Sequence, residues 1–363
     1  MRVPETPVTA DGPSTDLELE LPAGVPELEV TISPSGPAAG GDEPAGSWVF
    51  ELPEPGASVI RIEWLAEPAE RVRLSLGSHE RTASEAWADP EAMLWPDMAV
   101  RFRCGGESAE VRVKIASTEL LKRYYQSESH QQQYVVEHPF FESFHRGRLR
   151  CLEGLFRGYI EPGSRVLDVG SGYGIFYMIS ESWDLDITCC DLDTAAMEKM
   201  RGLAPQWNWV VADALHLPWG DASFDAVYAG EIIEHVPRPE EALSEWGRVL
   251  AGGGILILST PNRDRLLARA NGAVMPVHHE HLVEMNLAEL RSCARAAGFK
   301  VLAVTGVYME FLVNWWRPPG RRVDLLTARL GHPRYRFLYT AAMEMGRVAP
   351  SLAFDLVMVC RKR

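Results

Sequence analysis

Apolar and polar residues alternate through the first third of the chain in a series of short runs. Turn-forming Gly, Pro, Asp and Ser residues separate these runs. Alternation with a period of two is typical of strands that bury one face. The runs cover residues 17–21, 28–32, 47–52, 58–64, 71–76, 99–104 and 109–115. Residues 1–116 are therefore expected to form a small all-β sandwich, with about the first fifteen residues flexible.

The hydrophobic period changes after residue 116. Apolar residues recur at spacings of three and four around Leu120 and Tyr124, and again from Phe140 to Phe156. This spacing is typical of amphipathic helices. We expect residues 117–160 to form a helical lid and linker.

Longer apolar runs follow from residue 161. Continuous apolar strands with amphipathic helices between them are typical of a parallel sheet covered on both faces. Strands are predicted at residues 165–169, 185–190, 207–211, 224–229, 255–260, 299–305 and 352–360, and helices at 237–250 and 285–297. The helix at 237–250 is expected to end at the glycine run 252–254. The pattern predicts an α/β domain with a doubly wound sheet over residues 161–363, with an insertion at 307–350.

Three alternating glycines follow the first of these apolar strands. Asp168 lies in the strand, and Gly170, Ser171, Gly172 and Gly174 form the turn. Glycine allows a tight turn and a close approach to a ligand, while the next helix directs its N-terminal amides at that ligand. A plain βα turn in any doubly wound sheet is the simpler interpretation. Nicotinamide and flavin domains are a rival, but they usually space their glycines G-x-G-x-x-G.

The next two strands each end in an aspartate. Asp191, followed by Leu192, ends the second strand, where a carboxylate can accept hydrogen bonds from both ribose hydroxyls. Asp193 is expected to cap the following helix. Asp213 and Ala214 follow the third strand. The sequence thus predicts a nucleotide-like ligand at this edge of the sheet.

The glycine motif and the block at residues 217–236 resemble motifs of class I S-adenosylmethionine-dependent methyltransferases of the ubiquinone-biosynthesis type. The resemblance implies seven strands with the last one antiparallel, S-adenosyl-L-methionine as cofactor and S-adenosylhomocysteine as product. It also implies that Asp213 accepts a hydrogen bond from the adenine amine. The cofactor-binding residues that it implies are Asp168, Gly170, Ser171, Gly172, Gly174, Asp191, Leu192, Asp213, Ala214 and Glu231.

Two clusters of acidic and imidazole side chains follow the fourth and fifth strands, at residues 231–235 and 278–281. The first resembles a pattern that binds a divalent cation in ubiquinone-pathway O-methyltransferases and in small-RNA 3′-terminal 2′-O-methyltransferases. Such an ion, here Mg²⁺, would lower the pKa of an acceptor hydroxyl. The metal ligands implied by this resemblance are Glu231, Glu234, His235 and His281.

The same side chains have metal-free interpretations. Glu234 and His235 can position the following helix, because Glu-His-Val at this place is frequent in methyltransferases that use no metal. Methyl transfer to a hydroxyl needs aligned reactants and an acceptor for the proton. His279, His281 and His235 are therefore the candidate catalytic bases, since neutral imidazole titrates near working pH. An ordinary surface histidine is the remaining interpretation.

Charge and composition narrow the classes of partner. The chain has a net charge of −14, and residues 1–115 contain 9 Lys and Arg against 21 Asp and Glu. Such a surface repels phosphate backbones, so no long nucleic acid is expected as substrate. Without a signal peptide at the start or an apolar run of about 18 residues, a cytoplasmic protein with no transmembrane segment is expected.

The insertion at residues 307–350 indicates the chemistry of the methyl acceptor. Residues 314–322 combine two tryptophans with three arginines, in a region that faces the acceptor in the family. Cations and aromatics suit an anionic small-molecule or saccharide acceptor. We therefore expect O-methylation of such a hydroxyl, with an RNA-terminal 2′-O-methyltransferase and a non-catalytic scaffold of the same fold as alternatives. A homodimer through the N-terminal domain is a further hypothesis.

Overall fold

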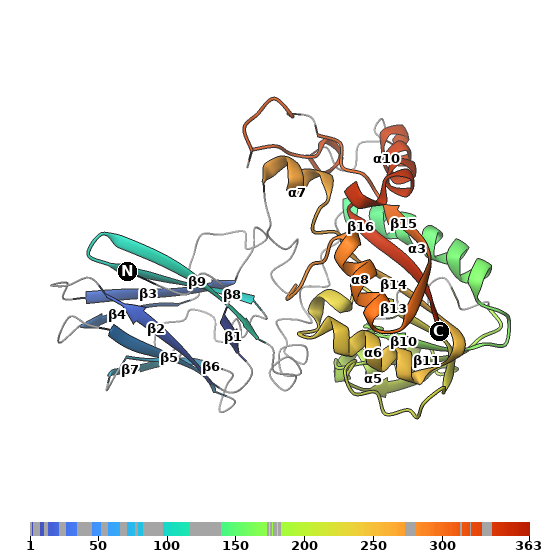
Figure 1. Cartoon of the computed structure of the whole chain (residues 1–363), viewed down its shortest axis with the longest axis horizontal. Coiled ribbons are helices and arrows are strands. Elements are labelled where there is room, and N and C mark those ends of the chain that lie inside the picture. Colours follow the sequence, from blue (N-terminus) through green and yellow to red (C-terminus); the bar gives the residue numbers. More distant parts are fainter. Residues whose placement is uncertain are drawn as a thin grey trace. The chain divides into compact units, whose positions relative to one another are not determined.

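The computed structural model describes residues 2, 8–10, 14–21, 27–34, 46–51, 57–65, 71–76, 79–82, 97–115, 139–172, 174, 176, 180, 183–272, 281–312, 314–319, 321–328 and 336–363. The chain splits into two compact units (Figure 1). One comprises Met1–Tyr134 with Val277–Leu282, and the other comprises Val135–Pro276 with Val283–Arg363.

The first unit contains two sheets, drawn as two layers in Figure 1. The strand orders are β1-β9-β8-β3-β4 and β2-β5-β6-β7. All the pairings are antiparallel except that of β1 with β9. The strands are β1 (Val8–Ala10), β2 (Ser14–Glu20), β3 (Glu27–Pro34), β4 (Gly46–Glu51), β5 (Ala57–Leu65), β6 (Arg71–Leu76), β7 (His79–Thr82), β8 (Asp97–Cys104) and β9 (Glu107–Ile115).

Alternating side chains explain these sheets. In β2, Leu17 and Leu19 are buried while Asp16, Glu18 and Glu20 are exposed, which is the pattern of a strand with one wet face. The predicted N-terminal β region is confirmed. Strands β1 and β7 were not predicted, because both are too short for alternation to distinguish them from loops.

The second unit is built on a seven-stranded sheet with the order β12-β11-β10-β13-β14-β16-β15. Only β16 is antiparallel, and it lies between β14 and β15. This order confirms the predicted class I fold with an antiparallel last strand. The strands are β10 (Arg165–Val169), β11 (Asp186–Asp191), β12 (Asn208–Val211), β13 (Phe224–Gly230), β14 (Leu250–Pro261), β15 (Phe299–Val307) and β16 (Asp355–Lys362).

Helices cover both faces of this sheet. Side chains of α6 and α8 pack in one core cluster with Leu167, and side chains of α3, α5 and α10 pack in another with Val166. Neighbouring residues of β10 thus pack into cores on opposite faces of the sheet, as expected for a parallel sheet. The helices are α3 (Pro139–Tyr159), α5 (Thr194–Leu203), α6 (Pro239–Val249), α7 (Leu266–Asn271), α8 (Leu287–Ala296), α9 (Leu325–Ala328) and α10 (Arg336–Val348), with 3₁₀ turns η2 (Ile233–His235) and η4 (Pro350–Leu352). In the described part of the chain no helix is long and apolar enough to cross a membrane.

The glycine run after α6 has a different role from the predicted one. The helix ends at Val249, and residues 252–254 belong to β14, so the prediction of a glycine helix end was wrong. The ladder between β13 and β14 shifts register between Phe224 and Ala226. A Cβ at Gly254 would lie 2.9 Å from the carbonyl oxygen of Asp225. The glycines therefore allow two backbones to approach where the strand is irregular.

Helix α10 packs closely against β15 through two glycines. A Cβ at Gly346 would lie 2.7 Å from the backbone nitrogen of Tyr308, and one at Gly306 would lie 2.5 Å from the carbonyl oxygen of Gly346. Side chains at these positions would force the helix away from the sheet.

Replacing Gly346 with Ala should therefore destabilise the fold by about 1–3 kcal/mol through overpacking. Gly154 on α3 is the matched control, because a Cβ there meets nothing within 4 Å. Gly154→Ala should increase stability by up to about 1 kcal/mol, since Ala favours a helix over Gly. Urea unfolding of both variants measures the difference. Equal effects of the two substitutions would contradict the close packing.

Candidate functional site

The turn after β10 has the backbone that its glycines predict. Gly170, Gly172 and Gly174 have φ angles of +71°, +48° and +74°, in the left-handed region that disfavours other residues. A Cβ at Gly170 would lie 2.7 Å from the side chain of Ile232, whereas one at Gly172 would meet nothing within 4 Å. Gly172 thus borders open space. A ligand can approach its backbone closely there.

The Asp191 carboxylate joins this turn to the end of β11. Its Oδ2 accepts from the Gly172 N–H at 2.8 Å, and its Oδ1 accepts from the Asp193 N–H at 2.9 Å. Each carboxylate oxygen can accept a second hydrogen bond. The side chain therefore points into the glycine turn. Leu192 is half-buried beside it, and Asp193 caps α5 as predicted, by accepting from Ala196.

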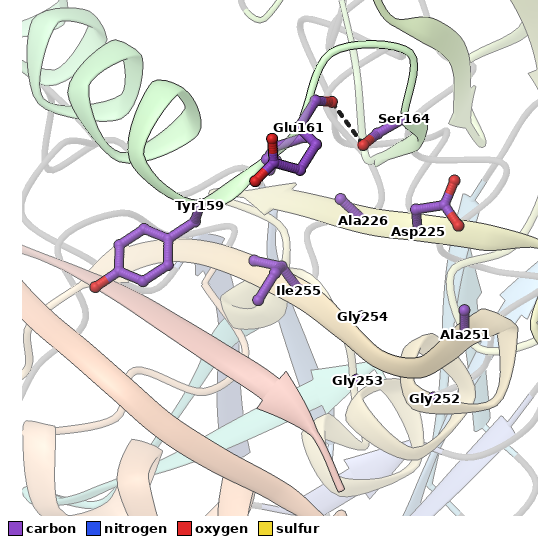
Figure 2. Close-up of a pocket in the computed structure, with 11 residues that line it drawn as sticks. Tyr159, Glu161, Ser164, Asp225, Ala226, Ala251, Gly252, Gly253, Gly254 and Ile255 are labelled. Atoms are coloured by element: carbon purple, nitrogen blue, oxygen red, sulfur yellow. Dashed lines mark hydrogen bonds between the residues drawn. The ribbon is translucent and has the colours of Figure 1, made fainter.

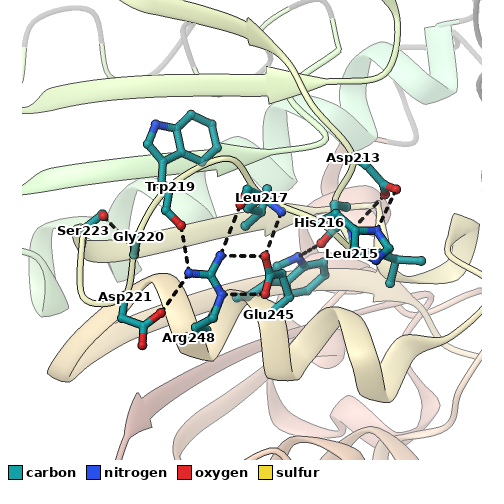
Figure 3. Close-up of polar contacts among 12 residues, drawn as sticks. Asp213, Leu215, His216, Leu217, Trp219, Gly220, Asp221, Ser223, Glu245 and Arg248 are labelled. Atoms are coloured by element: carbon teal, nitrogen blue, oxygen red, sulfur yellow. Dashed lines mark hydrogen bonds and ion pairs between the residues drawn. The ribbon is translucent and has the colours of Figure 1, made fainter.

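The turn after β12 lies beside the turn of Asp191. The Ala212 N–H donates to the Asp191 carbonyl at 3.0 Å. Asp213 accepts from the Leu215 N–H at 2.9 Å through Oδ1, and its Oδ2 lies 3.2 Å from Nδ1 of His216 (Figure 3). Parallel neighbouring strands end at one edge, which brings the three turns together.

Helix α6 holds the segment after Asp213 in place (Figure 3). The Arg248 guanidinium donates to the carbonyls of Leu217 and Trp219 at 3.2 and 2.8 Å and binds the carboxylates of Asp221 and Glu245. Glu245 also accepts from the Leu217 N–H at 2.8 Å. Two residues before Arg248, Trp246 donates its indole N–H to the Ala214 carbonyl at 3.0 Å. These contacts fix residues 213–221 to the domain.

A buried charge cluster lies where β13, β14 and β16 meet. Arg148 of α3 binds Glu231 at 3.0 Å and lies 3.6 Å from Asp355. Glu231 also accepts from the Ser259 hydroxyl at 2.5 Å, and its φ of +54° is unusual for a residue with a Cβ. Burial by itself would lower the pKa of Arg148. The negative charges of Glu231 and Asp355 have the larger effect, so the pKa of Arg148 is raised.

Asp168 and Ser171 are both buried next to the glycine turn. Burial raises the pKa of Asp168 well above its usual range, and the nearby charge of Asp191 adds to the effect. A carboxyl group in this state is sensitive to any cation that enters beside it.

Glu234, His235 and His281 offer ligand atoms that all lie within 4.8 Å of one another. The Val283 N–H donates to the Glu234 carbonyl at 3.1 Å, which holds the chain two residues after His281 beside Glu234. Glu234 is fully buried, and its Oε2 accepts from the Thr260 hydroxyl at 2.9 Å. Its Oε1 has no hydrogen-bond partner among the described residues. Burial, with the charge of Glu231, raises the pKa of Glu234 well above its usual range.

The structure thus groups most of the predicted residues, with three qualifications. Glu231 was expected among the metal ligands, but its carboxylate binds Arg148 and is not in the group of Glu234. His279 lies outside the described residues. Arg148 and Arg248 were not predicted to support the site, since all their partners except Glu245 are backbone carbonyls or acids distant in sequence. The spacing of Glu245 and Arg248 on one helix face was a usable signal for that pair.

A cavity of about 240 Å³ lies elsewhere, at the amino ends of β10 and β13 (Figure 2). Tyr159, Glu161, Ser164, Asp225 and the glycines of β14 line it. Two of its polar side chains have partners, since Ser164 donates to the Glu161 carbonyl and Asp225 binds Arg165. No predicted site residue lines this cavity.

Residues 167–258 match the family described as "Methyltransferase domain". The "Probable S-adenosylmethionine-dependent methyltransferase Rv3030" of Mycobacterium tuberculosis is 32% identical over 39% of this chain and 51% of its own length. The "O-methyltransferase cnsE" of Penicillium expansum is 31% identical over 40% of this chain and 55% of its own. The "Ubiquinone/menaquinone biosynthesis C-methyltransferase UbiE" of Ruegeria sp. is 37% identical over 27% of this chain and 42% of its own.

The chain spans about half the length of the first of these relatives, and the N-terminal β region lies outside the family match. Inside the match are most of β10, the glycine turn, Asp191, Asp213, Glu231 and Glu234, and the strand order is that of the class I fold. Residues 167–258 therefore belong to a methyltransferase domain, and the sheet that contains them has the strand order of the class I fold.

Proposed function

We propose that the protein transfers a methyl group from S-adenosylmethionine to a hydroxyl of a small-molecule or saccharide acceptor. The observation that carries the cofactor assignment is the Asp191 carboxylate, which lies against the turn where Gly172 borders open space. A carboxylate so placed can accept from two ribose hydroxyls while it keeps its backbone hydrogen bonds.

The other turns would bind the rest of the cofactor. Asp213 has acceptor capacity beyond its own turn for the adenine amine, with Ala214 and Leu192 beside the ring. Gly170, Ser171, Gly172 and Gly174 would surround the methionine part, above the buried Asp168. When bound, S-adenosylmethionine supplies an electrophilic methyl group on a positively charged sulfur. The residues of the chain have to orient it and exclude water.

A divalent cation held by Glu234, His235 and His281 favours oxygen as the methyl acceptor. The donor set fits a cation, because the buried Glu234 Oε1 lacks a hydrogen-bond partner among the described residues and faces two imidazoles. Such an ion would supply Lewis acidity, which would lower the pKa of an acceptor hydroxyl. Two imidazoles suit a transition-metal ion better than the Mg²⁺ that the sequence motif implies.

Without a cation, the same group can still remove the proton of the acceptor. His281 is buried, and the ring of His235 lies 3.9 Å from the Glu234 carboxylate. A carboxylate beside an imidazole stabilises the imidazolium that proton transfer forms. In this form His281, with His235 or His279, is the general base.

Replacing Asp191 with Ala should weaken the binding of S-adenosylhomocysteine at least about a hundredfold, because two hydrogen bonds to a charged acceptor are lost. Isothermal titration calorimetry measures the change. Asp186, exposed at the opposite end of β11, is the matched control, and Asp186→Ala should bind as the unchanged protein does. Binding of NADH instead of S-adenosylhomocysteine by the unchanged protein would contradict the proposal.

Replacing Arg248 with Gln should weaken S-adenosylhomocysteine binding about tenfold, since residues 213–221 lose their main anchor. Amide hydrogen exchange of that segment should become faster in the variant, while exchange in β10 should stay the same. Arg238, the residue that precedes the same helix, binds an exposed glutamate, and Arg238→Gln serves as the control. Unchanged exchange in Arg248→Gln would show that the anchor is unnecessary.

Replacing Glu234 with Gln should abolish the binding of Mn²⁺ and Mg²⁺ in calorimetric titrations, because a carboxylate ligand is lost. Glu198, exposed on α5, is the control, and Glu198→Gln should bind these ions as the unchanged protein does. Failure of the unchanged protein to bind either ion would contradict the cation site, and the proposal of a histidine general base would remain.

A further inference from the structure

The segment between β15 and α10 contains a loop that closes on itself at residues 311 and 325. Leu312 and Asp324 form an antiparallel bridge at its base. The buried Asp324 carboxylate accepts from the Tyr308 hydroxyl and from the Phe311 N–H. The Leu325 N–H donates to the Phe311 carbonyl. The base of the loop is therefore fixed to the end of β15.

Polar side chains also hold the loop from inside. The Asn314 side chain donates to the Arg321 carbonyl at 2.6 Å and accepts from the Val323 N–H at 2.7 Å. Asn271, at the end of α7, accepts from the Arg322 N–H at 3.0 Å and donates to its carbonyl at 2.9 Å. These hydrogen bonds link the two sides of the loop to each other and to α7.

The Arg322 side chain stabilises the loop through hydrogen bonds within the protein. Its guanidinium donates to the Ala270 carbonyl at 2.7 Å and to the Arg317 carbonyl at 2.9 Å. Of the three arginines in residues 314–322, Arg317 and Arg321 are the ones with exposed side chains.

This well-anchored loop presents two large aromatic side chains to solvent. Trp315 and Trp316 are each 69% exposed, with ring centroids 6.4 Å apart in an edge-to-face arrangement. Exposed apolar groups also lie on α10, at Phe337, Met345 and Val348. Residues at spacings of eight and eleven share a helix face. In Figure 1, α10 and the α7 anchor of the loop lie at the same end of the second unit.

Charge identifies the kind of surface that this loop fits. Residues 312–324 contain three Arg against one Asp, in a chain whose net charge is −14. Tryptophan favours the headgroup level of a bilayer, where its ring is apolar and its N–H meets water. Arginines near that level attract anionic headgroups. A basic loop with paired tryptophans can make both interactions with a bilayer surface.

We propose that the loop of residues 312–324, here called the Trp loop, docks on the surface of an anionic lipid bilayer. Trp315 and Trp316 insert at the headgroup level, and Arg317 and Arg321 bind lipid phosphates. The anchored base holds the tryptophans in their exposed positions before contact, so little conformational entropy is lost on binding. The α10 face with Phe337 extends the apolar contact.

Co-sedimentation of the full chain with phosphatidylglycerol–phosphatidylcholine vesicles tests this directly. The unchanged protein should bind these vesicles, fail to bind vesicles of phosphatidylcholine alone, and dissociate as NaCl is increased. Trp315→Ala with Trp316→Ala should weaken binding at least about tenfold, and Arg317→Gln with Arg321→Gln by a similar factor.

Two control variants match these changes elsewhere on the domain. Leu203→Ala removes a 62% exposed apolar side chain from α5, and Arg295→Gln removes an exposed cation from α8. Both should bind vesicles as the unchanged protein does. Equal binding of S-adenosylhomocysteine by all variants shows that the methyltransferase domain remains folded.

Three results would overturn the proposal. The first is no vesicle binding by the unchanged protein, and the second is equal binding to vesicles with and without phosphatidylglycerol. The third is full vesicle binding by the double Trp variant. If sedimentation equilibrium also shows a dimer that this variant dissociates, the tryptophans serve a second copy of the chain instead.

Discussion

The hydrogen bond from the Gly172 N–H to the Asp191 carboxylate is the contact on which the site depends. It joins the turn after β10 to the end of β11, and the second oxygen of Asp191 holds the start of α5 through Asp193. Parallel pairing of adjacent strands brings the two turns to one edge, and the carboxylate fixes their separation. A backbone without this bond would have to order its ligand cradle at the moment of binding, at a cost in conformational entropy.

A second set of contacts supports this edge from the helices. Arg248 and Trp246 of α6 hold the turn of Asp213, whereas Arg148 of α3 holds Glu231 beside Asp355. A buried ion cluster adds little net stability, because desolvation offsets the attraction between its charges. The left-handed backbone of Glu231 costs about 1–3 kcal/mol in addition. The protein thus keeps a desolvated ion cluster and a strained backbone at Glu231, and neither adds to stability. We infer that the cluster positions the residues at the end of β13.

Hydrophobic period and strand-end residues were sufficient to predict the sheet and the residues on its edge. Strands β10 to β13 were predicted from short apolar runs, and the cap at Asp193 follows from a local rule of helix capping. The glycine run of β14 was misread, because three glycines after a helix look the same whether they end it or enter an irregular strand. The partners of Arg148 are set by tertiary packing and leave no pattern in the sequence, whereas Arg248 has a partner three residues away, Glu245, that the helix spacing could have shown.

The arginines of the Trp loop show why a run of like charges should not be treated as a unit. Arg317, Arg321 and Arg322 are equivalent in the sequence, but the Arg322 guanidinium donates to two backbone carbonyls inside the structure. Five donors in a rigid fork suit arginine to this structural use as well as to ligand binding. Its role as an internal brace leaves Trp315 and Trp316 on an ordered, solvent-facing loop, with the other two cations beside them. Arg322 thus supports the loop that presents the tryptophans without contributing its own charge to their surface.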